Sequence, residues 1–364
     1  MPLQAQSTLA DLPHLYRLFL PKLLWEHVPR EVFATCSDCS MCLKEGQQPQ
    51  EKERYFDPNV KCCTYFPTLP NYLVGALLSD GEPYWEEGRR RVREKIRTRI
   101  GVTPRGIAPL KKDSLLYGHS KTNGFGKSRS LLCPYYHQEA GGCTVWPFRE
   151  AVCSTYFCKT ATGKSGERFW TSVRDFLLQV EQSLVTYVLL QCDYDPEDVV
   201  SSSHDSEELS AEEADGLPPN EEDYKVLWDD QDGREEDFYC EAYQIVSRLT
   251  PEEFEKVGGI NQQLHVDLIR KKRREMINPE LPQTLKFDRE IGPVQQDDGY
   301  FTFTKRGVII RVSREVCDVL PLYDGNRSLE EVQRAVEIYK NTRLDEEVII
   351  NLYNHEILQA VTES

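Results

Sequence analysis

The spacing of the cysteines constrains the fold of this chain more than any other feature. Nine of the twelve cysteines lie in two blocks, 36–63 and 133–158. In the first block the thiols are close enough in sequence for one tight turn to present two of them to the same metal ion, while backbone N–H groups stabilise their charge. The second block has no C-x-x-C pair, so its thiols are expected to complete or flank the site that the first block begins. We therefore expect the fold to wrap these segments around a metal. The candidate ligands are Cys36, Cys39, Cys42, Cys62, Cys63, Cys133, Cys143, Cys153 and Cys158.

Clustered cysteines can instead form disulfides, and the cellular compartment decides between the two. The apolar stretch at 9–25 is broken by charged residues and prolines, so it does not have the pattern of a signal peptide. No stretch approaches the roughly 20 apolar residues that span a bilayer. We expect a cytoplasmic protein with reduced thiols and no membrane partner.

The triple spacing Cys36-x-x-Cys39-x-x-Cys42 favours an iron–sulfur cluster, of the 4Fe–4S type, completed by a distant fourth cysteine. Zinc is the alternative, although zinc sites more often use two separate pairs of cysteines. The adjacent Cys62 and Cys63 do not easily share one metal, so one of them serves a second site or is free. The isolated cysteines are expected to act as small hydrophobic residues; they are Cys192, Cys240 and Cys317.

Helical periodicity is clear in three segments. Residues 167–191 place apolar side chains on one face of a helix, and residues 84–100 do so in a basic sequence. The basic segment includes the run Arg89-Arg90-Arg91, which we expect to lie on a solvated face. Residues 241–278 form the third, with Thr250-Pro251-Glu252-Glu253 as a helix start. Residues 1–35 are also expected to be helical, and the Gly-rich, basic segment 101–130 to form a long loop.

The acidity of the chain is concentrated in one segment. The net charge is −16, and residues 193–237 hold 19 acidic against 2 basic residues, which leaves the rest of the chain close to neutral. Such a balance excludes general affinity for nucleic acid. We expect 193–240 to be an acidic linker, loosely held except where aromatic residues near its end dock.

The last 66 residues follow a different pattern. Alternating apolar residues on either side of Lys305-Arg306-Gly307 predict a β-hairpin. Ser328 and Glu331 form a capping box for a following helix. This order of elements is typical of a small winged-helix domain. An excess of acidic over basic residues disfavours DNA as its partner.

Two resemblances follow from these residues. The segments CSDCSMC, CCTYFP and LLCPYYHQEAGGCTVWPFREAVCSTYFCK, within 36–160, resemble the YkgJ-like cysteine-cluster proteins, described as a putative zinc- or iron-chelating domain. Cys133-Pro134-Tyr135, Gly142-Cys143-Thr144-Val145-Trp146, Arg149 and Cys153 match the later part of that family's pattern. The first part departs from it, because a third cysteine is inserted and 19 residues separate Cys42 from Cys62. The resemblance implies metal chelation.

The C-terminal stretch resembles a PqqD-like domain, on Gly307-Val308-Ile309-Ile310 and on the run from Val319 to Val332. Domains of this kind resemble winged helices that bind a peptide at the exposed edge of the hairpin. The resemblance implies a peptide or protein partner, and an inert packing module is the alternative.

Other motifs in the sequence give weaker evidence of function. Two Gly-Lys-Ser triplets, at 126–128 and 163–165, lack the upstream glycine of a phosphate-binding P-loop, whose place is taken by Lys121 and Cys158. We therefore expect loops there. His119 and His137 lie near cysteines in sequence and are conceivable ligands, more often donors to a ligand or surface residues.

Together these observations predict a mainly α protein with small β elements. Its expected parts are an irregular, helical cysteine-cluster metal domain at 1–192, an acidic linker at 193–240, a helical connector at 241–298 and a PqqD-like, winged-helix-like domain at 299–364. The expected function is a cysteine-ligated iron–sulfur centre, in a redox or peptide-modifying enzyme. The alternative is a zinc-stapled, non-catalytic interaction module.

Overall fold

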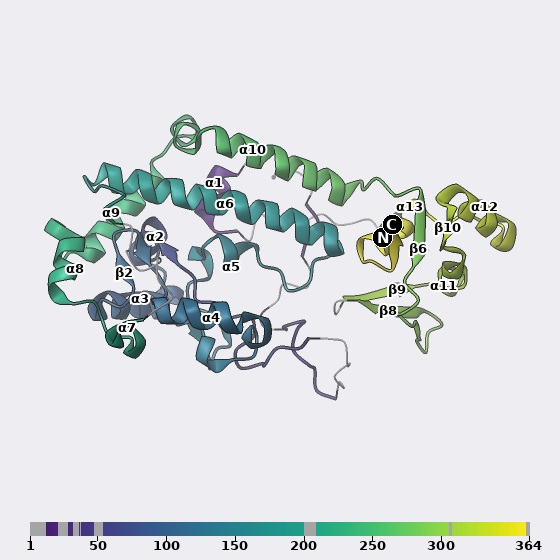
Figure 1. Cartoon of the computed structure of the whole chain (residues 1–364), viewed down its shortest axis with the longest axis horizontal. Helices are drawn as coiled ribbons and strands as arrows, with labels where there is room; N and C mark the ends of the chain where they lie inside the picture. The colour runs from purple at the N-terminus through teal and green to yellow at the C-terminus, as the bar shows by residue number, and fades with distance from the viewer. Residues whose placement is uncertain are drawn as a thin grey trace.

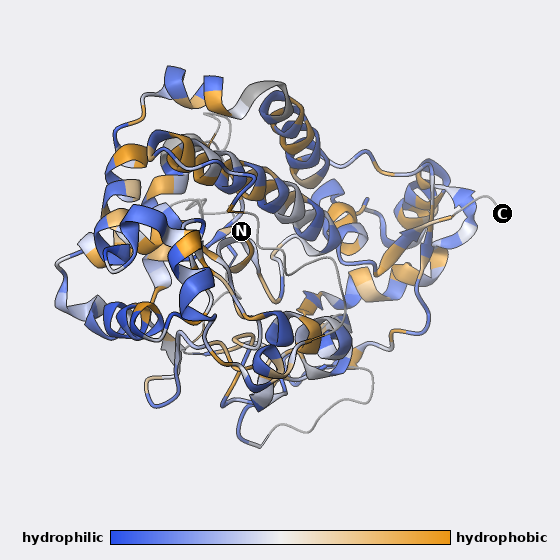
Figure 2. Ribbon diagram, turned by 60° about the vertical axis from the view of Figure 1, so that its left-hand side comes forward, coloured by the Kyte–Doolittle hydropathy of each residue, from blue (hydrophilic) through white to orange (hydrophobic). Residues whose placement is uncertain are grey.

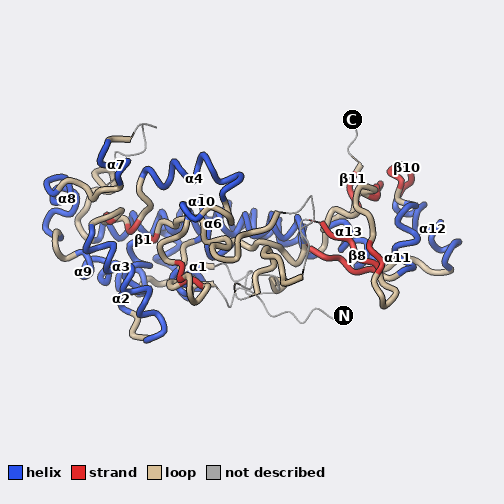
Figure 3. The backbone as a smooth tube through the Cα atoms, turned by 90° about the horizontal axis from the view of Figure 1, so that it is seen from below, coloured by secondary structure: helices blue, strands red, loops and turns tan. Residues whose placement is uncertain are grey.

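The computed structural model describes residues 12–20, 28–31, 36, 38–46, 54–199, 209–305 and 308–361. The described chain is mainly helical and its sheets are small, as the red segments of Figure 3 show. The predicted fold class is confirmed at this level. Among the described helices, none combines the length and apolar character that crossing a membrane requires.

The helices are α1 (His14–Phe19), α2 (Asn71–Ser79), α3 (Glu86–Thr98), α4 (Lys111–Gly124), α5 (Ala151–Thr155), α6 (Gly163–Gln191), α7 (Ala211–Asp215), α8 (Glu221–Trp228), α9 (Glu235–Ser247), α10 (Pro251–Ile277), α11 (Arg314–Val319), α12 (Leu329–Lys340) and α13 (Glu346–Asn354). Short 3-10 helices lie at η3 (Pro83–Trp85), η4 (Arg129–Leu131), η5 (Trp146–Phe148), η7 (Asp229–Gln231) and η8 (Leu320–Leu322). The strands are β1 (Leu69–Pro70), β2 (Val102–Thr103), β3 (Gly106–Ile107), β4 (Tyr136–His137), β5 (Gly142–Cys143), β6 (Thr284–Phe287), β7 (Val294–Gln295), β8 (Phe301–Lys305), β9 (Val308–Val312), β10 (Asp324–Ser328) and β11 (Leu358–Ala360).

The larger of two hydrophobic cores is built on α6. This helix buries a continuous apolar stripe that includes Phe169, Val173 and Leu184, as its periodicity predicts. The helix α10 lies along α6 (Figure 1), and α2 packs against α9. The long helices carry both hydrophobic and hydrophilic residues (Figure 2), so one face of each is free to meet solvent.

The segment predicted as an acidic linker differs in the structure. From residue 209 on, the segment forms α7, α8 and the start of α9. Its aromatic residues Tyr224, Trp228 and Phe238 are buried in the larger core. The acidic side chains gather instead in the first turns of α8 and α9, where they complement the positive end of the helix dipole. Residues 200–208 of the predicted linker lie outside the described residues.

The smaller core belongs to a C-terminal unit that begins earlier than residue 299. Strand β6 pairs with β10 and β11, and Leu285 is part of the smaller core, so the unit starts near residue 281. The predicted hairpin is present as β8 and β9, with Phe303 opposite Ile310. The capping box of Ser328 and Glu331 opens α12 as predicted. The winged-helix identity of this unit stays a prediction.

The expectation for 101–130 is wrong, because the segment contains the small strands β2 and β3 and the helix α4 rather than one long loop. The Gly-Lys-Ser triplet at Gly163 is likewise not a loop but the first turn of α6. The predicted helix at 84–100 is present as η3 and α3. Of the N-terminal 35 residues, α1 is the helix within the described part.

Candidate metal centre

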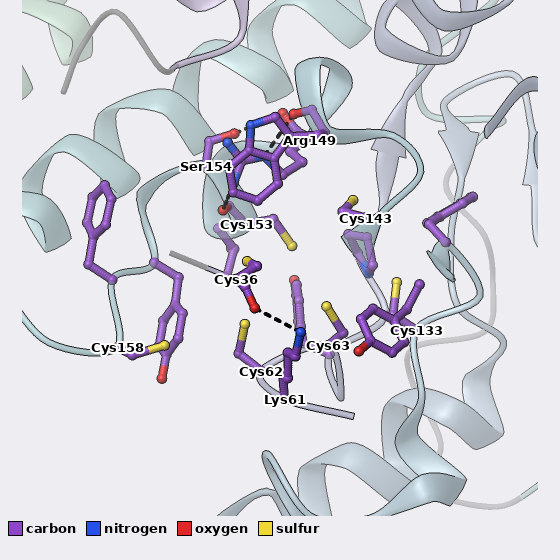
Figure 4. Close-up of a pocket in the computed structure, with 18 of the residues that line it drawn as sticks. Cys36, Lys61, Cys62, Cys63, Cys133, Cys143, Arg149, Cys153, Ser154 and Cys158 are labelled. Atoms are coloured by element: carbon purple, nitrogen blue, oxygen red, sulfur yellow. Dashed lines mark hydrogen bonds between the residues drawn. The ribbon is translucent and has the colours of Figure 1, made fainter. Parts of the chain in front are cut away.

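The cysteine blocks meet at one cavity of about 800 Å³. Eight of the nine predicted ligands line it, namely Cys36, Cys39, Cys62, Cys63, Cys133, Cys143, Cys153 and Cys158. Figure 4 shows the sulfurs of Cys62, Cys63 and Cys153 directed towards the central space. Cys42 is not part of the lining; its N–H donates to the Cys39 carbonyl at 3.1 Å, so it lies at the edge of the same turn.

A compact turn presents Cys62 and Cys63. The Asp57 carbonyl accepts the N–H groups of Val60 and Lys61 at 3.1 and 2.8 Å, and Lys61 has a left-handed φ of 51°. This conformation reverses the chain just before the two cysteines. The Cys63 carbonyl then accepts the Cys133 N–H at 2.8 Å, so the two blocks are joined by a backbone hydrogen bond.

The second block combines a two-stranded ribbon with a short helix. The ribbon pairs Tyr136 of β4 with Cys143 of β5. Glu150 caps α5 by accepting the N–H groups of Val152 and Cys153 at 2.5 and 2.8 Å, which fixes Cys153 in the first turn of that helix. Cys158 follows three residues after α5 ends.

A buried carboxylate of the long helix α6 holds α5 in place. Glu181 Oε1 accepts the Ala151 N–H at 2.8 Å and also a hydrogen bond from the Tyr16 hydroxyl. Burial, reinforced by the nearby Glu150, raises the pKa of Glu181 well above its usual range. The neutral carboxyl is therefore favoured in this apolar setting.

Two of the basic residues that line the cavity hold its cysteine segments. The Lys61 ammonium donates to the carbonyls of Cys36 and Gly141, both at 2.8 Å, and so connects the first cysteine turn to the β4–β5 ribbon. The Arg149 guanidinium lies 3.3 Å from the centre of the Trp146 ring and donates to the Cys153 carbonyl at 3.1 Å. Positive charge beside clustered thiols favours their ionised form.

The thiols do not share one electrostatic environment. The thiols of Cys158 and Cys63 donate hydrogen bonds to the Cys62 sulfur, and these lower the pKa of Cys62 well below its usual value. Burial raises the pKa of Cys36 to about 11 and that of Cys133 to about 12. Cys62 is thus the thiol most readily ionised in this cavity.

The cysteine thiols surround the cavity without converging on a single position. Across the described residues, no three Cys, His, Asp or Glu side chains are close enough together to hold one metal ion. Tyr135 also lines the cavity, and its hydroxyl is fully buried with no hydrogen-bond partner in the described chain. The wide spacing of the thiols suits a sulfur-rich group larger than a single ion.

The predicted histidines do not reach the cavity. His119 is exposed on α4, and His137 Nδ1 accepts the Ala140 N–H at 3.1 Å. Cys192, Cys240 and Cys317 pack against the two hydrophobic cores, as predicted.

Sequence reasoning missed Lys61 and Glu181. Glu181 had a recognisable signal, because it is an acidic residue within the apolar stripe of α6. Lys61 had no recognisable sequence signal beyond its position directly before Cys62. Searches of protein-family models, of curated proteins and of solved structures found nothing that matches this chain.

Proposed function

We propose that this chain is a cytoplasmic metal-binding protein that holds an iron–sulfur centre in the thiol-lined cavity. The observation that carries the proposal is the convergence of eight cysteines, separated by up to 122 positions in the sequence, on one cavity. The three cysteines outside the blocks pack against the cores and do not line the cavity.

The width of the cavity favours iron–sulfur over zinc. Zinc binds thiolate sulfur at about 2.3 Å in a closed tetrahedron, so four ligands of a prearranged zinc site would lie within a few ångströms of one another. The thiols instead border a space of about 800 Å³. Inorganic sulfide and iron atoms can bridge thiolates across such a space.

The contacts among the eight cysteines form one connected group. Cys63 interacts with Cys62, Cys133 and Cys143, and Cys158 interacts with Cys62, Cys39 and Cys36. Eight thiols are enough for two 4Fe–4S clusters, each of which requires four thiolates. In this proposal the adjacent Cys62 and Cys63 would serve different clusters.

An iron–sulfur cluster would supply one-electron redox chemistry. The residues around it have distinct tasks in this proposal. Lys61 and Arg149 offset the negative charge of the thiolates. The Glu150 cap and Glu181 keep Cys153 in place.

The peptide-binding role predicted for the C-terminal unit belongs to the same proposal. Among the described strands β9 pairs with β8 alone, and the Ile309 side chain is 63% exposed. A peptide could add to the open edge of β9. Hydrogen exchange of the β9 amides, with and without a candidate peptide, tests this; unchanged exchange with a peptide that binds would exclude this edge.

The central experiment is iron, zinc and acid-labile sulfide analysis of protein purified without oxygen, together with the visible spectrum. We expect iron and sulfide in similar amounts, and their loss in Cys63→Ser and in Cys62→Ser. Cys317→Ser is the matched control and keeps full metal content. Zinc without sulfide in the wild-type protein would overturn the iron–sulfur proposal and favour the zinc-stapled interaction module.

A further inference from the structure

A separate cavity of about 420 Å³ lies between the helices α3 and α4 and the segments 64–68 and 130–134. Tyr65 and Tyr117 form part of its wall and also of the wall of the thiol-lined cavity. Lys95 and Asp113 are the charged side chains in its lining, and many of the others are apolar, including Phe66, Leu131, Leu132 and Pro134. A cavity of this size with an apolar wall and a few polar groups is typical of a site for a small molecule.

Lys95 differs from the other basic residues of α3. The five arginines of this helix each pair with a glutamate, whereas the Lys95 ammonium has neither an ion pair nor a hydrogen bond within the described chain. Lys95 Nζ lies 5.1 Å from the centre of the Phe66 ring, which lines the cavity. The residue is half-buried, and Nζ itself is still accessible to solvent. Burial lowers the pKa of Lys95, so an anionic partner would stabilise the ammonium.

Asp113 presents the opposite charge from the first turn of α4. Its neighbours in sequence turn away towards α7, because Lys111 pairs with Glu213 and Lys112 donates to the Ala214 carbonyl. Among the described residues, the Asp113 carboxylate has no ion pair and accepts no hydrogen bond, and it too is only half-buried. The Asp113 charge acts on Lys95, but the two groups do not form an ion pair with each other.

The two unpaired charges restrict which ligand this cavity can take. Asp113 disfavours a ligand with a large negative charge, such as a phosphate, and Lys95 disfavours a simple cation. Each charge complements the dipole of its own helix, but that role does not require both of them to line the same cavity. A ligand that carries a carboxylate and an ammonium together with an apolar part would satisfy both charges and the apolar wall.

We propose that this cavity binds a free α-amino acid with an apolar side chain. The carboxylate of the amino acid would bind the Lys95 ammonium, and its ammonium would bind Asp113, so that both bonds are charge-assisted. The apolar side chain would lie against Phe66 and Leu131. An internal residue of a peptide does not fit, because it carries neither charge on its backbone. The proposal does not depend on the metal centre.

Calorimetric titration of the full-length protein with L-phenylalanine, and separately with L-leucine, tests the site. We expect one saturable site per chain for at least one of them. The compounds 3-phenylpropionate and phenethylamine lack the ammonium and the carboxylate of phenylalanine, respectively. Each should bind about tenfold more weakly than phenylalanine or worse, because a charge-assisted hydrogen bond is lost. This comparison needs no variant. The proposal is overturned if neither amino acid binds saturably, or if either truncated compound binds as tightly as phenylalanine.

Two substitutions place the ligand in this cavity. Lys95→Met should weaken phenylalanine binding about tenfold or more and leave phenethylamine binding unchanged, because phenethylamine has no carboxylate to lose. Asp113→Asn should weaken phenylalanine binding similarly and leave 3-phenylpropionate binding unchanged. The control Lys225→Met, which removes an exposed lysine paired with Glu221 on α8, should change nothing. If both Lys95→Met and Asp113→Asn bind phenylalanine as tightly as the wild type, the amino acid binds elsewhere and the proposal is wrong.

Discussion

Lys61 connects the two cysteine blocks through its side chain. The ammonium bonds to the carbonyls of Cys36 and Gly141, which are 105 positions apart in the sequence. We expect Lys61→Met to destabilise the protein by about 2 kcal/mol, because two charge-assisted hydrogen bonds are lost and their carbonyls remain partly buried. Urea unfolding measures the change, and metal content should fall with it.

Lys44→Met is the matched control for that substitution. Lys44 pairs with Asp38 at the protein surface, where an ion pair contributes about 0–1 kcal/mol. Equal effects of the two substitutions would show that Lys61 acts only as a surface charge.

The arginine run on α3 illustrates how neighbours in sequence take different roles. Arg90 is exposed and pairs with Glu87 alone, whereas Arg91 pairs with Glu87 and also donates to the carbonyls of Pro134 and Tyr136 at 2.5 and 3.0 Å. Arg89 is 5% exposed. The predicted solvated face therefore holds for one of the three residues.

These contacts give a second prediction. Arg91→Ala should lower the free energy of unfolding by roughly 1–3 kcal/mol, because it removes bonds that hold the β4 strand beside Cys133. Arg90→Ala should leave it almost unchanged, because solvent screens an exposed ion pair. Chemical denaturation of both variants measures this, and equal losses would contradict it.

At the scale of elements, the contact between α2 and α9 depends on Gly75. A Cβ built at Gly75 would lie 1.7 Å from the Tyr239 carbonyl oxygen, whereas one built at Gly118 on α4 meets nothing within 4 Å. We expect Gly75→Ala to destabilise by about 2 kcal/mol or more through overpacking. Gly118→Ala should stabilise by up to about 1 kcal/mol through helix propensity. Thermal denaturation distinguishes the two signs.

The junction of α5 and α6 should make stability depend on pH. The pKa of Glu181 is raised in the folded protein, so above the unfolded value of about 4.5 the native state holds more protons than the unfolded state. Stability is then lost as pH rises from there towards the folded pKa. Glu181→Gln keeps the acceptor oxygen and should remove this loss, with a slope difference of up to about 1.4 kcal/mol per pH unit.

Glu94→Gln is the control for that experiment. Hydrogen bonding from Arg97 lowers the pKa of Glu94. The contribution of Glu94 to stability therefore has the opposite sign: it is present above the pKa that Glu94 has in the unfolded chain. Parallel stability curves for Glu181→Gln and the wild type between pH 5 and 7 would contradict the assignment.

At the scale of the whole molecule, the two hydrophobic cores should unfold separately. Within the described residues the larger core involves 12–276 and the smaller core 285–358. We expect two calorimetric transitions in the full-length protein. Removal of the proposed metal by a chelator should lower only the transition of the larger core, because metal binding would contribute folding free energy there. One transition that shifts as a whole would show that the cores unfold together.

Secondary structure was predicted well where it depends on residues within a single short segment. The apolar stripe of α6, the hairpin of β8 and β9, the helix start at Thr250 and the capping box at Ser328 all depend on residues a few positions apart. The prediction was poorest for the acidic segment. Its composition favours disorder, but Trp228 and Phe238 give it enough apolar surface to join the larger core.

The sequence by itself determined that nine thiols would be available as ligands and that the chain would be mainly helical, because cysteine spacing and helical periodicity are local. Only the tertiary structure decided which eight thiols share a cavity, and that Lys61 and Glu181 hold the segments that carry them. Tertiary structure likewise decided that the loop after α13 packs against the start of α6. These relations join residues far apart in the chain, and the packing of whole helices, rather than any local pattern, brings them together.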